Sequence, residues 1–135
     1  TGGFALSMML EPAVLAPVLS QPSLPFPVTA SRRAAIDIDE QSLARVRDRL
    51  VREDLSVLGL RFSADPVCTK GRFDMLRARL GDRFEAIEID SSPGNPHGIA
   101  GKAHSVLTVD LVDRAGHPTR AALDRVLEFF AQRLR

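Results

Sequence analysis

LSVLGLRFSADP, residues 55–66, is the stretch that decides the fold. It is a nearly continuous apolar run that stops at an acid and a proline, Asp65 and Pro66. Such a run is typical of a strand that is covered on both faces, as strands of a parallel sheet are. FEAIEID (84–90) is a second strand-like segment, and a helical pattern over 70–81 lies between the two. The order strand, helix, strand predicts parallel strands flanked by helices.

The same alternation extends in both directions along the chain. Apolar residues at helical spacing predict a helix over 2–11, which Pro12 stops, and the run AVLAPVLS (13–20) predicts a buried strand. Pro17 inside that run favours an edge strand or a bulge, because proline donates no hydrogen bond to a sheet. Residues 21–37 hold three prolines and no period, so we expect a loop that could lie over a cleft.

Capping residues mark the remaining helices. Asp37 or Asp39 can cap a helix over about 40–53, and Thr69 can cap the helix over 70–81. A last helix is expected from Thr119 to about Leu134, after a Gly- and Pro-rich loop at 91–101. The 135 residues suit a single α/β domain.

Composition excludes several classes of function. A net charge of +1 gives no concentrated basic surface for nucleic acid. No apolar stretch reaches the roughly 18–20 residues that span a bilayer, and we expect neither a membrane partner nor a signal peptide. The single cysteine, Cys68, rules out an internal disulfide and suits a reducing cytoplasm, so a cytoplasmic location is expected.

Asp65 and His97 are the candidate catalytic residues. Each follows the predicted carboxyl end of a strand, where ligands gather in open α/β sheets. A histidine there can take a proton from a nucleophile, and an acid bonded to its other nitrogen fixes its tautomer. Alone, however, an acid at this position often only caps a loop, and a loop histidine is usually just a solvated polar residue.

Four segments together resemble the dienelactone hydrolase family of α/β-hydrolases: TGGFALSMML (1–10), LAPVLSQPSLPFP (15–27), LGLRFSADP (58–66) and SSPGNPHGIAGKAHS (91–105). The match runs in order over nearly the whole chain and covers the C-terminal half of that fold. The resemblance implies that Asp65 is the triad acid and His97 the triad base. It also implies a Cys or Ser nucleophile two residues before Thr1, and therefore an open sheet edge where the N-terminal half is missing.

No residue within the chain is an obvious replacement for the nucleophile. Cys68 lies near Asp65, and Ser20 ends a strand, but neither sits on the glycine-flanked turn that exposes a nucleophile. His104 is expected on a short helix in a structural role. Arg32 and Arg33 could bind a substrate carboxylate, although a plain loop charge pair is the commoner role for such residues.

Three hypotheses of function follow. The first is a carboxylic ester or lactone hydrolase that works through an acyl-enzyme, without a metal or cofactor. The second is a non-catalytic half-domain that associates through its open edge, either with a copy of itself or with a complementary N-terminal half. The third is a flavodoxin-like binding module, which ranks last because no Gly-rich phosphate loop follows Ser20.

Overall fold

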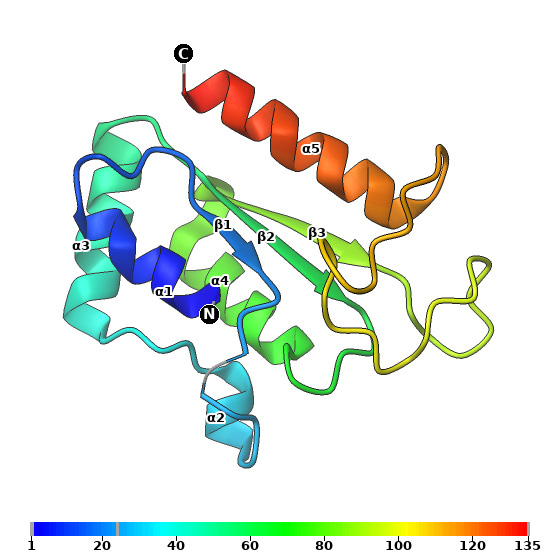
Figure 1. Ribbon diagram of the computed structural model, residues 1–135. Helices are drawn as coiled ribbons and strands as arrows, with labels where there is room; N and C mark the ends of the chain where they lie inside the picture. The colour runs from blue at the N-terminus through cyan, green and yellow to red at the C-terminus, as the bar shows by residue number, and fades with distance from the viewer. Residues whose placement is uncertain (1, 24, 135) are drawn as a thin grey trace.

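The computed structural model describes residues 2–23 and 25–134, which form a small α/β domain around a three-stranded parallel sheet. The strands are β1 (Val18–Ser20), β2 (Val57–Phe62) and β3 (Phe84–Ile89), and they lie side by side in the order β1-β2-β3 (Figure 1). β2 is therefore the central strand, and all six of its residues are buried. The predicted parallel βαβ unit is confirmed.

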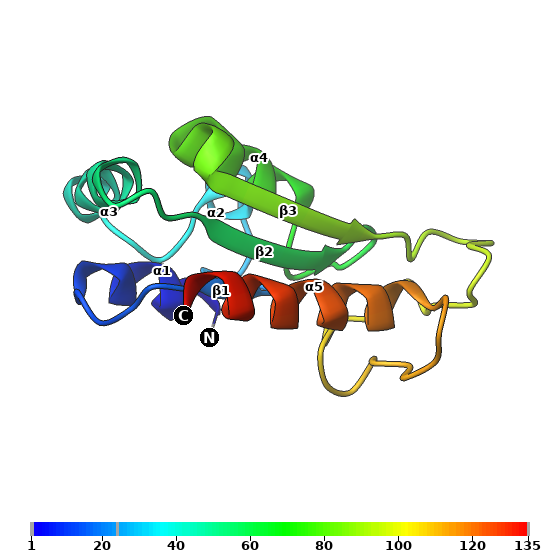
Figure 2. The same ribbon diagram turned by 90° about the horizontal axis from the view of Figure 1, so that it is seen from above.

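Helices cover both faces of this sheet. The helical elements are α1 (Gly2–Ser7), η1 (Met8–Leu10), α2 (Ala30–Ala34), α3 (Glu40–Arg52), α4 (Lys70–Leu80), η2 (Gly81–Arg83) and α5 (Pro118–Arg133). α3 and α4 lie on one face, and α5 lies across the other (Figure 2). Among the described residues, no helix is both long and apolar enough to cross a membrane.

Alternation along β2 divides the core in two. Leu58, Leu60 and Phe62 pack with α5 and with the loop that precedes it. The opposite face of β2 carries Val57, Gly59 and Arg61 and packs toward α3 and α4. At Gly59 an added Cβ would lie 2.6 Å from the Phe84 ring, so the packing of this ring against β2 favours a glycine there.

The predicted caps begin the helices as expected. Asp39, not Asp37, caps α3 by accepting a hydrogen bond from the Ser42 amide, at 2.8 Å. Thr69 caps α4 by accepting from the Arg72 amide. These side chains satisfy amide groups that have no partner inside their own helix.

Three expected elements differ from those observed. β1 is much shorter than the run 13–20, because Pro17 cannot donate to the ladder; only its carbonyl takes part, accepting from the Leu58 amide. The helix expected over 2–11 tightens into the 3-10 turn η1 at Met8. The segment 21–37, predicted as a loop, contains the short helix α2.

The long connection from β3 to α5 returns over the sheet. It contains turns but no helix, so His104 does not lie on the expected short helix. Ala103 and Val106 of this connection are buried in the core on the α5 face. This packing brings the segment around residue 104 to the carboxyl ends of β1 and β2, which is where the candidate site lies.

Candidate functional site

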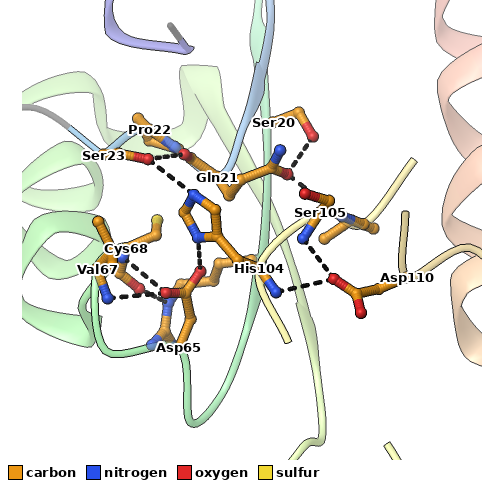
Figure 3. A network of polar contacts seen from close by, with 12 residues as sticks. Ser20, Gln21, Pro22, Ser23, Asp65, Val67, Cys68, His104, Ser105 and Asp110 are labelled. Atoms are coloured by element: carbon orange, nitrogen blue, oxygen red, sulfur yellow. Dashed lines mark hydrogen bonds and ion pairs between the residues drawn. The ribbon is translucent and has the colours of Figure 1, made fainter. Parts of the chain in front are cut away.

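Asp65 lies in the turn after β2, and its carboxylate is completely enclosed. Its side chain has no exposed surface, and its Oδ1 accepts hydrogen bonds from the amides of Val67 at 2.8 Å and Cys68 at 3.0 Å. Its Oδ2 lies 2.6 Å from Nδ1 of His104 (Figure 3). The two amides fix one carboxylate oxygen, so the other is aimed at the histidine.

The histidine at Asp65 is His104, which corrects the predicted pairing with His97. His97 lies in an exposed loop, where its amide donates to Asn95 Oδ1 at 3.2 Å. Its ring packs against His117, with 5.2 Å between the ring centroids. Because the loop at 92–99 closes on itself through Asn95, His97 stays at the β3 side of the sheet, away from Asp65.

Asp110 holds the main chain of His104 in place. One of its carboxylate oxygens accepts from the amides of His104 at 3.0 Å and Ser105 at 2.8 Å. The imidazole side chain is 36% exposed, so it is anchored by its backbone and by Asp65 while one edge stays open to solvent. This is the arrangement that a proton-transferring histidine needs.

The contact with Asp65 determines which nitrogen carries the proton. A carboxylate only accepts hydrogen bonds, so Nδ1 of His104 donates and Nε2 of the neutral ring keeps its lone pair. That Nε2 lies 3.0 Å from the hydroxyl of Ser23, in the loop after β1. The hydroxyl is also 2.9 Å from the Gln21 carbonyl, so its single proton has two acceptors within reach. Nε2 is therefore the basic atom of the site.

A cleft of about 400 Å³ opens beside His104. Its lining combines apolar side chains with a few polar groups: Ala5, Val18, Ser20, Gln21, Ser23, His104, Leu107 and Thr108. Small-molecule sites usually combine these two kinds of lining. A second cavity of about 420 Å³, at the β3 edge, contains His97 and lacks both Asp65 and His104.

Cys68 cannot act as a nucleophile in this state. The thiol is buried, and desolvation together with the nearby Asp65 carboxylate raises its pKa to about 12. Because the thiolate is the reactive form, a thiol with this pKa is inert near neutral pH. Ser20, the other candidate from the sequence, donates its hydroxyl to Gln21 Oε1 and does not contact His104.

Arg72 on α4 fixes the loop that carries Ser23. Its guanidinium is fully buried and donates to main-chain carbonyls of the segments on either side of α2, among them Pro22 at 2.6 Å and Ala35 at 2.7 Å. By contrast, Arg32 and Arg33 of α2 are exposed and do not line the cleft. The less favoured alternative, that they bind a substrate carboxylate, therefore finds no support at this cleft.

The sequence contains a signal that could have identified His104. It lies in AHSVL (103–107), where the apolar residues Ala103 and Val106, both buried, flank the polar pair His104 and Ser105, so its backbone is held by the core. His97 is instead flanked by proline and glycine. Ser23 had no such signal, because its position depends on the path of a proline-rich loop.

No group of three or more His, Cys, Asp or Glu side chains that could bind a metal ion occurs in the described ranges 2–23 and 25–134. Comparisons of this chain with protein-family models, curated proteins and solved structures found no match.

Proposed function

We propose that this chain forms the acid–base half of a carboxylic ester or lactone hydrolase similar to the dienelactone hydrolases. The observation that carries the proposal is the path from buried Asp65 through His104 to a cleft at the carboxyl ends of β1 and β2. In parallel α/β folds, ligands bind at this end of the sheet. The chain order of acid before histidine is also that of the α/β-hydrolases.

The chemistry assigns a separate task to each side chain. Nε2 of His104 removes the proton from a hydroxyl or thiol as that group attacks the ester carbonyl, and the tetrahedral adduct collapses when His104 returns the proton to the leaving alcohol. Water then repeats the sequence against the acyl-enzyme and releases the acid. Throughout, Asp65 holds the imidazole in one tautomer and stabilises its protonated form.

The attacking group is expected outside residues 1–135, two residues before Thr1, as the family resemblance implies. Within the described residues, the Ser23 hydroxyl is the only group of this kind that touches Nε2 of His104. A nucleophile from outside these residues must approach Nε2 as closely as the Ser23 oxygen does, at 3.0 Å. Ser23→Ala separates the two sources: it leaves acylation intact if the nucleophile precedes Thr1 and abolishes it if Ser23 itself is acylated.

Two histidine variants test the proposal in the longest natural form of the protein that contains these residues. His104→Ala should lower kcat/KM for an aryl ester by about 10²- to 10⁴-fold, the usual contribution of a positioned base. His97→Ala is the matched control, because it removes an exposed imidazole outside the cleft and should leave activity within about twofold. Equal activity of His104→Ala and wild type, with circular dichroism unchanged, would refute the proposal.

A second candidate function is association with another chain. In the part of the chain that the structure describes, β1 pairs only with β2, so its other edge has no strand beside it. Phe4 and Met8, which belong to the neighbouring α1–η1 segment, are more than half exposed, at 56% and 54%. An unpaired edge next to apolar surface is a template for pairing with a second copy or a complementary half.

Light scattering distinguishes this candidate from the first. The association hypothesis predicts a dimer of residues 1–135 at micromolar concentration that Phe4→Ser or Met8→Ser converts to monomer. A monomer under these conditions, with no complex on addition of the N-terminal half, would exclude it.

A further inference from the structure

Gln21 is held in a backbone conformation that its residue type does not favour. Its φ is +37°, in the left-handed region, directly after the carboxyl end of β1. A residue with a Cβ is disfavoured there by roughly 1–2 kcal/mol relative to the right-handed region. Strained residues of this kind persist where the surrounding structure holds them, and they cluster at functional sites. A glycine would avoid the cost, so the side chain at this position is the feature to explain.

Neighbouring groups hold the backbone of Gln21 and one end of its side chain. Its amide donates to the Leu60 carbonyl at 2.8 Å, and its carbonyl accepts from the Ser23 hydroxyl at 2.9 Å. Its Oε1 accepts from the Ser20 hydroxyl (Figure 3) and from the Val106 amide, the latter at 3.4 Å. A main-chain amide is always a donor, so the atom facing Val106 must be the oxygen.

The other end of the carboxamide, Nε2, carries two N–H groups. No acceptor among the described residues lies within hydrogen-bonding distance of it, although Gln21 lines the same cleft as His104. Gln21 thus presents an unused donor at the cleft that also contains the basic nitrogen of the site.

We propose that Nε2 of Gln21 donates a hydrogen bond to an uncharged acceptor oxygen of the substrate, such as the carbonyl of an ester or lactone. The inference rests on the proposed hydrolase function. A neutral donor in a partly apolar cleft suits a neutral oxygen, and the lining residues include no lysine or arginine to balance a carboxylate. The part of the cleft that this chain supplies therefore favours an uncharged ester or lactone.

Gln21→Glu is the sharpest test, because it keeps the shape of the side chain and an oxygen for Ser20 and Val106 while replacing the donor with an acceptor. The loss of one hydrogen bond corresponds to about a tenfold effect, and the unpaired carboxylate adds to it, so kcat/KM for a neutral aryl ester should fall by at least about tenfold. Gln41→Glu, at an exposed position in α3, makes the same change of charge and should leave kcat/KM unchanged. Gln21→Gly, which accepts the positive φ freely, is a second variant that should show the same loss.

A binding measurement keeps this proposal separate from the proposed hydrolysis. Titration with γ-butyrolactone, followed by NMR, should shift the side-chain amide signals of Gln21 together with the ring signals of His104. If His104 responds while Gln21 does not, or if Gln21→Glu and Gln21→Gly retain full kcat/KM, the donor role is wrong and the hydrolase proposal stands. If neither residue responds and no ester is turned over, both proposals fail.

Discussion

Replacing Arg72 with methionine should destabilise the protein strongly, because the buried guanidinium holds three segments together. Its donors reach the carbonyls of Pro22 and Pro25 in the loop after β1, of Arg32 and Ala35 around the end of α2, and of Val67 after β2. Methionine fills a similar space but donates nothing. The carbonyls would then remain buried without partners, or water would have to enter.

The size of the effect can be worked out from these contacts. A hydrogen bond from a charged group contributes about 1.5–3 kcal/mol, but the contact to Val67 at 3.4 Å is too long to count fully. Desolvation acts in the opposite direction and lowers the pKa of Arg72 from its usual value. Because such contributions do not add, we expect a loss of about 3–5 kcal/mol, the cost of leaving a few buried carbonyls without partners at about 1–3 kcal/mol each. The free energy of unfolding of a domain of this kind is only about 5–15 kcal/mol in total, so this loss would be a large part of it.

Urea unfolding followed by circular dichroism measures this loss, and α4 itself supplies the control. Arg77, on the same helix, is exposed and forms an ion pair with Asp74 at 3.1 Å. Arg77→Met should therefore cost at most about 1 kcal/mol. A difference below about 1 kcal/mol between Arg72→Met and Arg77→Met would refute the argument that the buried guanidinium stabilises these segments.

Three further outcomes follow from the site and its surroundings. Asp65→Asn should leave the fold intact but lower kcat by about 10⁴-fold, because the new amide donates to Nδ1 of His104 and forces the imidazole into the wrong tautomer. ¹⁵N NMR of the His104 ring would report the tautomer, and an unchanged tautomer would contradict this prediction. Cys68, with its pKa raised to about 12, should react with iodoacetamide far more slowly at pH 8 in the native protein than in urea, and equal rates would be evidence against its burial. Desolvation lowers the pKa of His117 from 6.5, so the unfolded chain takes up the proton first and the free energy of unfolding should fall as pH drops below about 6.5. Since Nδ1 of His117 accepts from the Thr119 amide, His117→Asn should keep the cap and flatten this part of the pH profile measured by thermal unfolding.

The local sequence pattern correctly predicted those elements in which the structural preference of the residues agrees with their environment in the fold. β2 is a nearly continuous apolar run that ends shortly before Asp65 and Pro66, and the caps Asp39 and Thr69 lie one residue before their helices. Chemistry within a few residues decides each of these features. Where proline interrupts the pattern, at Pro17 beside the short β1 and in the proline-rich segment around α2, the expected boundaries were wrong.

Only the part of the site that lies directly at the end of a strand could be predicted from the sequence. Asp65 was identified because the end of a parallel strand fixes where the next residues lie. The histidine was not, because its place depends on how a long loop without regular structure packs its buried residues Ala103 and Val106. Ser23 and Gln21 depend on the position of Arg72, which is fifty residues away from Pro22 along the chain.

The buried guanidinium also defines a site for chemical rescue. Arg72→Ala would leave a pocket bordered by the carbonyl oxygens that Arg72 normally binds, including those of Pro22, Ala35 and Arg32. A free guanidinium ion has the same planar donors, and binding to the folded state alone would stabilise it. Low concentrations of guanidinium chloride should therefore raise the melting temperature of this variant while lowering that of the wild type. A common denaturant would act on this one variant as a ligand.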